Sequence, residues 1–423
     1  MTTRPILPGA VLGMMGGGQL GRMFVEAARR MGYRVHVYGP TAGDPAMQAT
    51  DLHTVAPYDD ADAVERFAGA VEVVTFEFEN VPAEATSRAA RHAPVRPGGG
   101  ILATTQNRIR EKAFLSDHGF PVTRHAVVTD PSELEASLAD VGSPAILKTA
   151  AWGYDGRGQL SIDGGDGSLA AARDLLQAGP GMLEARVDFE LECSVVVARG
   201  LDGDIRTFGP IRNVHRDHIL DVSTAPADLP PRVEQEARAI AEGIAEQLEL
   251  VGVLCVELFG LADGRLVVNE LAPRPHNSGH LTIEGCTVSQ FEQQVRAVCG
   301  LPLGDMKPVS PAAMANLLGD LWSDGEPAWT ELLAVPGVHL HLYGKRHPRP
   351  RRKMGHLTVL GASATAARDA VLAARERLWT GRDPRTTHAA PLSLEPVSVM
   401  IESSGSRRCG SDERHVQPAV PSD

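Results

Sequence analysis

Short apolar runs alternate with amphipathic stretches over the first hundred residues of the chain. The apolar run at 10–15 predicts a buried strand, and apolar side chains at helical spacing predict a helix over 19–31. Two further apolar runs, at 34–38 and 71–78, also predict strands. Because strands and helices alternate, we expect an open parallel α/β sheet in this region.

Beyond residue 100 the pattern changes to longer strands with fewer helices between them. Apolar runs predict strands at 144–149, 187–198 and 205–212. A helical stretch at 232–249 then precedes an apolar hairpin at 252–270. This second region therefore mixes helices and strands in the α+β manner.

Breaks in the pattern divide the chain into four segments. A glycine-rich turn at 97–100 marks the first break, and we expect domains at 1–105, 106–305 and 306–380, the last being the smallest. Residues 381–423 are rich in Pro, Ser, Arg and Thr without periodicity, which predicts a disordered tail.

Composition narrows the class of protein. The chain has 423 residues and a net charge of -12, which argues against a general binder of nucleic acid or of a membrane surface. We see no apolar run of the length that a membrane span needs. The five cysteines include no CxxC pair, so neither a disulfide framework nor a zinc site is supported, and we expect free thiols in the cytoplasm.

A glycine-rich turn follows the first predicted strand. Gly16–Gly21 matches the dinucleotide-binding pattern GxGxxG, in which backbone N–H groups meet an anion at a helix N-terminus. That pattern also needs an acidic residue at the end of the second strand, and 37–41 contain none. We therefore favour the phosphate of a small substrate on this loop over a dinucleotide or a purely structural turn.

A second glycine-rich loop follows Lys148, which ends an apolar strand. A lysine on a strand is a point charge for a nucleotide phosphate, and glycines let the backbone of 152–159 close over the phosphates. A plain hairpin turn would not need the crowded side chains of Tyr154 and Asp155. The acidic stretch at 184–192 could hold an adenine and a ribose, although that signal is weak on its own.

Two carboxylates are expected to face each other on the hairpin. If Asp263 and Gly264 form a two-residue turn, Glu257 lies directly opposite Glu270. Like charges in this arrangement destabilise a strand pair unless something positive lies between them. A hard divalent cation such as Mg²⁺ resolves the conflict, and the alternative is a bulge that turns one glutamate to solvent.

Two polar segments follow the hairpin. Arg274, His276 and Asn277 lie in a loop just beyond the carboxylate pair, where we expect a wall of the active site rather than a solvated loop. Six Lys and Arg residues crowd into 345–353 of this acidic chain, and they favour an anion site for a substrate phosphate over a solvated face.

Six motifs together resemble one family of the ATP-grasp superfamily, the 5-(carboxyamino)imidazole ribonucleotide synthases, over about residues 8–380. The resemblance implies an N-terminal Rossmann-like pre-ATP-grasp domain, a central ATP-grasp domain and a small C-terminal domain. It implies a ligase that forms a C–N bond by carboxylating 5-aminoimidazole ribonucleotide with ATP and bicarbonate, through carboxyphosphate, in purine biosynthesis. The motifs are GGGQLGRM (16–23), TFEFENVP (75–82), QNR (106–108), GYDGRGQ (153–159), NELAPRPHNSGH (269–280) and YGK…RKMGH (343–356).

The resemblance also implies roles for individual residues, a cytoplasmic homodimer, and Mg²⁺, with two ions expected and Mn²⁺ as a substitute. The residues that would bind ATP are Arg108, Lys148, Gly153, Tyr154, Asp155, Gly156, Arg157, Gly158, Gln159, Glu184, Ala185, Arg186, Val187, Glu192, His215, Asn269 and Glu270. Glu257 and Glu270 would hold the metal. Those that would bind the ribonucleotide are Gly18, Gln19, Leu20, Glu77, Tyr154, Asp155, Lys345 and Arg352. Those that would take part in catalysis are Lys148, Tyr154, Asp155, Arg274, His276 and Asn277.

One departure and three alternatives accompany this interpretation. Arg351 stands where the family has glycine, so the conformation of the basic loop needs inspection. An NAD-dependent oxidoreductase would explain only the first glycine turn. A formate-using glycinamide ribonucleotide transformylase would share the ATP site but not the motifs at 75–82 and 343–356. A non-catalytic relative is expected to lack one of Lys148, Glu257 and Glu270, and all three are present.

Overall fold

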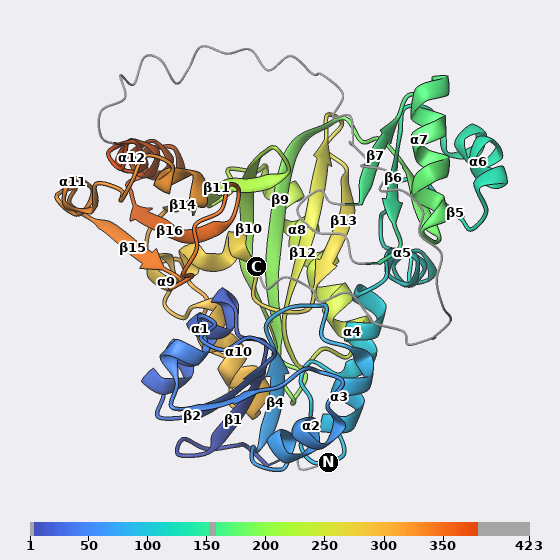
Figure 1. Ribbon diagram of the computed structural model, residues 1–423. Coiled ribbons are helices and arrows are strands. Elements are labelled where there is room, and N and C mark those ends of the chain that lie inside the picture. The colour runs from blue at the N-terminus through green and yellow to red at the C-terminus, as the bar shows by residue number, and fades with distance from the viewer. Residues whose placement is uncertain (1–3, 152–157, 380–423) are drawn as a thin grey trace.

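The computed structural model describes residues 4–151 and 158–379 (Figure 1). The predicted tail at 381–423 and residues 152–157 of the second glycine-rich loop lie outside these ranges. The strands form three sheets, of four, eight and four strands. Among the described residues, no helix has both the length and the apolar character needed to cross a membrane, and the four cysteines are free thiols.

The N-terminal sheet is open and parallel, as its alternating pattern predicts, with the strand order β3-β2-β1-β4. Gly32, at a φ of +84°, follows the end of the first helix and turns the chain into the second strand. The elements are β1 (Val11–Met15), α1 (Gln19–Arg30), β2 (Arg34–Gly39), η1 (Met47–Ala49), β3 (Leu52–Val55), α2 (Ala61–Ala68), β4 (Val73–Phe76), α3 (Ala83–Ala89) and α4 (Gly99–Thr105).

A small antiparallel sheet, in the order β5-β8-β6-β7, carries the strand that ends in Lys148. Its helices pack on one apolar cluster with Leu147 and Leu183. The helix before it begins at Arg108 because the Asn107 side chain caps the N–H groups of Ile109 and Arg110. The elements are α5 (Arg108–Asp117), β5 (His125–Val128), η2 (Pro131–Glu133), α6 (Leu134–Val141), β6 (Ala145–Thr149), β7 (Gln159–Ile162), α7 (Asp166–Gln177) and β8 (Gly181–Ala185).

The largest sheet has the order β13-β12-β9-β10-β11-β14-β16-β15. Its strands from residue 312 onward continue the same sheet as the central strands, beside β11, rather than forming a separate layer. The elements are β9 (Phe189–Arg199), β10 (Ile205–Arg216), β11 (Ile219–Ala225), α8 (Pro231–Gln247), β12 (Gly252–Leu261), β13 (Leu266–Ala272), η3 (Asn277–Leu281), α9 (Thr282–Gly285), α10 (Gln290–Cys299), β14 (Ala312–Leu318), η4 (Gly319–Trp322), α11 (Trp329–Leu333), β15 (Val338–Leu342), β16 (Lys353–Leu360) and α12 (Ala364–Glu376).

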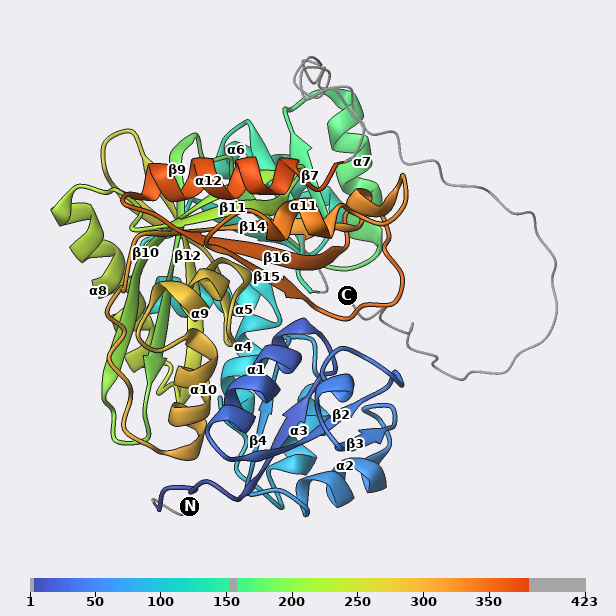
Figure 2. The ribbon, with the colours of Figure 1, turned by 90° about the vertical axis from the view of Figure 1, so that its left-hand side faces the viewer.

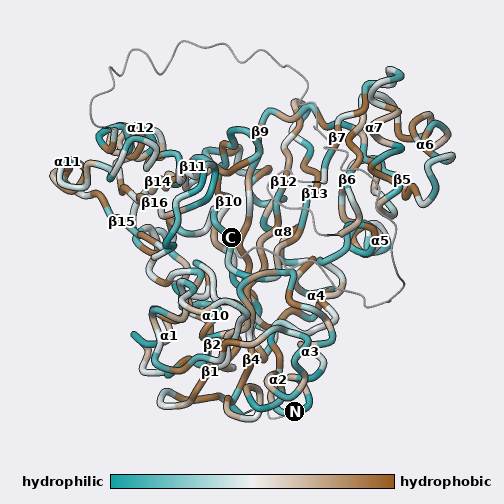
Figure 3. The backbone as a smooth tube through the Cα atoms, viewed as in Figure 1, coloured by the Kyte–Doolittle hydropathy of each residue, from teal (hydrophilic) through white to brown (hydrophobic). Residues whose placement is uncertain are grey.

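Helix α10 joins the N-terminal part of the chain to the large sheet. Its residues Phe291, Val295 and Val298 pack into the same apolar cluster as Leu12 and Phe24, so they complete the core beside β1 and α1 (Figure 2). The hydrophobic stretches of the chain follow strands such as β4 and β13, and many of the outer loops are hydrophilic (Figure 3). The N-terminal sheet is therefore held against the rest of the molecule by shared burial.

A cluster of histidines lies where β15 and β16 meet the chain after β13. The rings of His341 and His356 stack 4.4 Å apart, and His280 lies 4.9 Å from His356. The Tyr343 hydroxyl is 3.0 Å from His356 Nδ1. His280 and His356 are fully buried, and this burial, followed by the charge of neighbouring histidines, lowers the pKa of each well below its ordinary value of 6.5.

We therefore expect acid to destabilise the fold through these two imidazoles. Below a pH of about 6.5 these imidazoles bind protons in the unfolded chain but remain neutral in the folded chain. Their contribution to the free energy of unfolding is therefore complete above this pH and is lost as the pH falls below it. Each histidine should contribute a slope of about 1.4 kcal/mol per pH unit. His356→Asn should flatten the pH dependence of the unfolding free energy by about one such slope in urea titrations.

The control is His218→Asn, which changes an exposed histidine in the turn between β10 and β11. This variant should keep the slope of the unaltered chain. Parallel pH profiles for His356→Asn and the unaltered chain would contradict the assignment of acid sensitivity to the buried cluster.

Candidate active site

The hairpin β12–β13 places Glu257 directly opposite Glu270, as the sequence predicts. The route to this pairing differs from the prediction. The loop between the strands closes at Leu261 and Arg265 and so has three residues rather than two, and a one-residue bulge near Glu257 then restores the predicted register. Two departures of one residue cancel, so the pairing is confirmed although the assumed turn is wrong.

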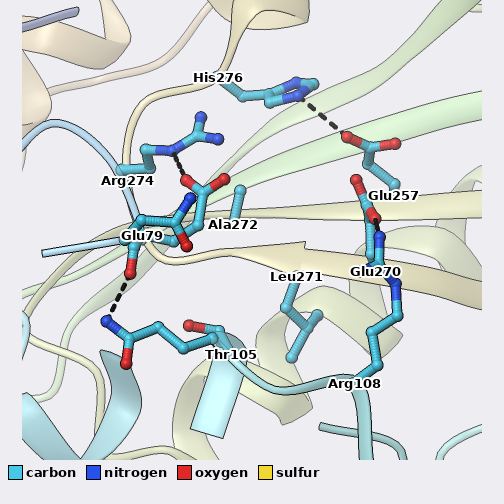
Figure 4. Close-up of a pocket in the computed structure, with 11 residues that line it drawn as sticks. Glu79, Thr105, Arg108, Glu257, Glu270, Leu271, Ala272, Arg274 and His276 are labelled. Atoms are coloured by element: carbon cyan, nitrogen blue, oxygen red, sulfur yellow. Dashed lines mark hydrogen bonds and ion pairs between the residues drawn. The ribbon is translucent and has the colours of Figure 1, made fainter. Parts of the chain in front are cut away.

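A cavity opens around this pair, between the end of β4, the helices α4 and α5, and the ends of β12 and β13 (Figure 4). The end of β4 and the loop after β13 bring Glu79 and Arg274 together in an ion pair. The described residues that line the cavity are Glu79, Asn80, Thr105, Gln106, Arg108, Glu257, Glu270, Leu271, Ala272, Arg274 and His276.

The two carboxylates have different partners. Glu257 Oε1 lies 2.9 Å from His276 Nε2, whereas the Glu270 carboxylate lies at a longer distance, 3.8 Å, from the Arg108 guanidinium. Burial would raise the pKa of Glu257, but His276 outweighs it and lowers this pKa. Enclosure and the facing Glu257 raise the pKa of Glu270, although 44% of the Glu270 side chain remains accessible. Glu270 is thus the carboxylate whose charge is least compensated.

A buried chain of hydrogen bonds runs from His276 to side chains on β9, β10 and β11. His276 Nδ1 is 2.8 Å from Ser278 Oγ, which is 2.7 Å from Ser194 Oγ on β9. The Asn213 side chain on β10 donates to Ser194, and Ser223 on β11 donates to Asn213. This chain of hydrogen bonds leaves His276 Nε2 facing Glu257. Burial would lower the pKa of His276, but Cys255 and Glu257 raise it to about 10.

The predicted nucleotide residues gather on the small sheet and the adjoining strands. Lys148 Nζ lies 2.7 Å from Glu184 Oε2 and 3.5 Å from Asn269 Oδ1, and both Lys148 and Glu184 are buried. Glu192 on β9 and His215 on β10 are 2.7 Å apart. Lys148 and Glu184 therefore form one polar pair beside Asn269, and Glu192 and His215 form a second pair on β9 and β10.

The other predicted nucleotide residues flank these pairs. Ala185 ends β8, and Arg186 and Val187 follow it. Gly158 has a φ of +68° and precedes Gln159 at the start of β7. A Cβ atom on Gly158 would lie 2.4 Å from Thr149 Oγ1, so the loop needs glycine there. Gly153, Tyr154, Asp155, Gly156 and Arg157 lie outside the described residues.

The sequence reasoning missed Glu111 and Lys112 on α5. Lys112 Nζ donates to the backbone carbonyls of Val268 and Asn269, at 3.2 and 2.8 Å. Glu111 accepts the Leu271 N–H at 3.1 Å, and burial raises the pKa of Glu111 to about 8. A signal was available, since positions 108, 111, 112 and 115 have the spacing of a buried helix face, yet three of them are charged.

The first glycine loop holds an anion from its own chain. The Glu77 carboxylate accepts the N–H groups of Gly18 and Gly21, the latter at 2.7 Å. A carboxylate of the chain thus takes up the donors on which the sequence predicts a substrate phosphate, and the phosphate position stays a prediction. Gln19 and Leu20 begin α1 beside this contact.

The basic segment lies against this loop. Burial raises the pKa of Asp44 and of Glu77. The positive charges of Lys345 and Arg352 oppose this rise at Asp44, and that of Lys345 opposes it at Glu77. The Gln48 side chain donates to the Gly344 carbonyl at 2.9 Å and so ties the segment to the N-terminal sheet. The structure thus brings the predicted ribonucleotide residues at both ends of the chain to one place.

Two predicted features have a different environment from the one expected. Asn277 does not line the cavity with Arg274 and His276; it is buried and exchanges side-chain hydrogen bonds with Asn316 on β14. Arg351 has a φ of +69°, the left-handed region in which glycine is favoured. Its N–H donates to Asp320 and its guanidinium to the Asp217 carbonyl, at 2.6 and 2.7 Å. These contacts hold the loop in the conformation that glycine adopts without strain.

Three family models match the chain. A model described as the ribonucleotide synthetase preATP-grasp domain matches residues 10–106, and the ATP-grasp domain matches 113–291. A model described as the phosphoribosylaminoimidazole carboxylase C-terminal domain matches 312–370. The three matches follow one another in the order that the sequence motifs imply.

Relatives and solved structures agree with these models. The chain is 42% identical over 362 residues to the N5-carboxyaminoimidazole ribonucleotide synthase of Bacillus subtilis (strain 168), which covers 85% of this chain and 94% of that protein. An ADP complex of an N5-carboxyaminoimidazole ribonucleotide synthetase is 40% identical, with a TM-score of 0.84, over 88% of this chain and 98% of that one.

A further similar structure is the Aspergillus clavatus N5-carboxyaminoimidazole synthase in complex with ADP and 5-aminoimidazole ribonucleotide. It is 30% identical, with a TM-score of 0.80, over 87% of this chain and 98% of that one. Sequence identity and coverage of this extent establish common descent and a common fold. The chain belongs to the N5-carboxyaminoimidazole ribonucleotide synthase family of the ATP-grasp superfamily.

Proposed function

We propose that this chain carboxylates the exocyclic amine of 5-aminoimidazole ribonucleotide with bicarbonate at the expense of ATP, in purine biosynthesis. The products are 5-carboxyaminoimidazole ribonucleotide, ADP and phosphate. The observation that carries the proposal is the opposed pair Glu257 and Glu270, which shares one cavity with Arg274 and His276. The ADP and ribonucleotide complexes of similar enzymes support the same pair of substrates.

The nucleotide would lie along the small sheet and the end of β13. Lys148 and Arg108 would meet its phosphates, and the residues at 153–159 would close over them. The backbone of Glu184–Val187 would receive the adenine, while Glu192 and His215, already paired at 2.7 Å, would receive the ribose. These roles rest on the positions of the described residues and on the family resemblance.

The Glu257 and Glu270 pair fits a divalent cation that is completed by phosphate oxygens. Among the residues that the structure describes, no group of three or more His, Cys, Asp and Glu side chains is arranged to hold a metal ion. Two carboxylates alone suit Mg²⁺, which usually keeps a few protein ligands and takes the rest from substrate phosphates and water. When bound, Mg²⁺ or Mn²⁺ would offset the charge of the transferring phosphoryl group. Two ions are expected from the family.

The chemistry needs an activated form of bicarbonate, which is a poor electrophile. Arg274, which pairs with Glu79 at the cavity wall, would hold the bicarbonate while one of its oxygens attacks the γ-phosphorus of ATP and ADP leaves. His276 would supply positive charge to the resulting carboxyphosphate. The substrate amine would then attack the carboxyl carbon and release phosphate, with Asp155 accepting the amine proton. Exclusion of water matters because carboxyphosphate hydrolyses.

The ribonucleotide would lie between the first glycine loop and the basic segment. Glu77, held by two backbone N–H groups, offers a fixed acceptor for the base or the ribose. Lys345 and Arg352 would take the substrate phosphate, because the donors of the glycine loop are already used by Glu77. A homodimer and a cytoplasmic location are further predictions from the family.

The proposed reaction predicts coupled turnover. With saturating Mg²⁺, ATP and bicarbonate, ADP release should rise sharply when 5-aminoimidazole ribonucleotide is added, and labelled carbonate should enter the product in equal amount. ADP release that ignores this ribonucleotide, but responds to glycinamide ribonucleotide with formate, would replace the acceptor assignment with that of the related transformylase.

Removing either carboxylate should greatly slow catalysis without unfolding the protein. Glu257→Gln and Glu270→Gln should each lower kcat by about a hundredfold or more, the scale of losing one electrostatic contact in the transition state. The Tm of the unliganded Glu270→Gln protein should not fall, since the substitution relieves like-charge repulsion. Glu190→Gln, at an exposed position of β9, is the matched control, and near-normal kcat in Glu270→Gln would count against the pair.

Lys345→Met should act on one substrate only. Losing a charge-assisted contact to phosphate costs about 2 to 3 kcal/mol, which predicts a rise of about 30- to 160-fold in the KM for the ribonucleotide. The KM for ATP should stay within about twofold, a change of under 0.5 kcal/mol. Lys307→Met, at a lysine with 78% of its side chain exposed, serves as the control. A change in the KM for ATP instead would assign Lys345 to the nucleotide.

A further inference from the structure

The bulge in β13 decides where the Glu270 carboxylate points. Between the hairpin loop and the bulge, Leu258 pairs with Val268; beyond it, Glu257 pairs with Glu270, so Asn269 is the extra residue. Had the register continued without the bulge, Glu257 would face Asn269, and Glu270 would turn to the other face of the sheet. The opposed carboxylates therefore depend on one irregular backbone position.

This bulge lies on an edge strand. β13 is the first strand of the eight-stranded sheet, and among the described residues its outer edge is met by an isolated bridge between Val268 and Val122, with the Val268 N–H donating to the Pro121 carbonyl at 2.7 Å. A bulge also disrupts the inner hydrogen bonds of the ladder. Buried backbone groups at such a place need other partners, or the bulge can move along the strand.

Helix α5 supplies further partners with two ionisable side chains, Lys112 and Glu111. The Lys112 ammonium donates to the carbonyls of Val268 and Asn269, at 3.2 and 2.8 Å, on the loop side of Glu270. The Glu111 carboxylate accepts the N–H of Leu271 at 3.1 Å, on the other side. The backbone contacts of α5 thus lie on both sides of the residue whose direction matters.

Burial strengthens these hydrogen bonds. Lys112 and Glu111 are 1% and 3% exposed, so water does not compete for their hydrogen bonds. A buried ionisable side chain on an otherwise apolar helix face costs stability and is a poor choice for packing alone. Leu115, one turn further along the same face, shows that an apolar residue is accepted there.

We propose that Glu111 and Lys112 are positioning residues that fix the bulge at Asn269 and so hold the Glu270 carboxylate opposite Glu257. The inference rests on the proposed role of this pair as metal ligands. Both residues contact the backbone of β13 rather than the metal site, so their effect on metal binding would be indirect.

Lys112 has a second contact that the test must separate. Its ammonium lies 3.5 Å from Glu184, which also receives Lys148 at 2.7 Å. A Lys112 variant can therefore disturb the nucleotide side as well as the bulge. The hydrogen bond of Glu111 to β13 runs to Leu271 alone, so Glu111 variants report on the bulge more cleanly.

The test compares Mn²⁺ binding to four variants in the presence of saturating ADP, followed by electron paramagnetic resonance. Glu111→Met removes the acceptor for Leu271, and Lys112→Met removes both donors to the bulge. We expect each to weaken Mn²⁺ binding by about tenfold or more, whereas Glu111→Gln, which keeps an acceptor of the same shape, should remain within about threefold. Leu115→Ala should lower Tm and leave the Mn²⁺ affinity unchanged.

ADP affinity without metal completes the design. Glu111→Met should bind ADP in the presence of a chelator as tightly as the unaltered chain does. If Glu111→Met fails to fold, Lys112→Gln, which keeps one donor, gives the answer through an intermediate loss of Mn²⁺ affinity. Unchanged Mn²⁺ binding in the folded Glu111→Met or Lys112→Gln protein would overturn the proposal.

Glu270→Gln distinguishes this failure from a failure of the proposed function. If Glu270→Gln loses Mn²⁺ affinity while Glu111→Met keeps it, the metal site stands and the positioning role falls. If Glu270→Gln itself binds Mn²⁺ normally, the metal assignment of the pair is wrong, and the positioning role falls with it.

Discussion

Two carboxylates held face to face are the constraint around which the site is built. Glu257 and Glu270 repel each other across the strand pair, and the fold keeps them together with groups from distant parts of the chain. His276 compensates Glu257 from the loop after β13, and Arg108 approaches Glu270 from α5. Burial, followed by repulsion from Glu257, raises the pKa of Glu270, so its charge is not fully offset by the described side chains.

The arrangement of the sheets explains how one cavity draws on so many segments. Helix α10, from late in the chain, completes the core beside β1, and the strands after residue 312 extend the central sheet. These two connections fix the N-terminal sheet and the basic segment relative to the hairpin. As a result Lys345 lies near Glu77, although 268 positions separate them in the sequence.

Much of this was predictable from the sequence where periodicity or motif spacing decides the outcome. The parallel N-terminal sheet follows from alternating strands and helices, and the opposition of Glu257 and Glu270 from a hairpin count. That count succeeded because a longer loop and a bulge cancel, and no local pattern announces a bulge. The partner of the first glycine loop was missed because Glu77 reaches it only through the fold. Lys112 was missed because its contacts with the β13 backbone exist only in the folded chain.

The carboxylates of Glu77 and Glu270 differ in the hydrogen-bond donors that surround them. Glu77 is also buried, and burial raises its pKa too, but its carboxylate receives two backbone N–H groups at the start of α1. Among the described residues no backbone N–H donates to Glu270; the N–H next to it, that of Leu271, is directed to Glu111 instead. The hydrogen bond from Leu271 to Glu111 is therefore proposed to fix the direction of the Glu270 carboxylate without offsetting its charge. Because β13 positions the Glu270 carboxylate without offsetting its charge, this carboxylate can bind a metal ion together with the phosphates that the ion carries.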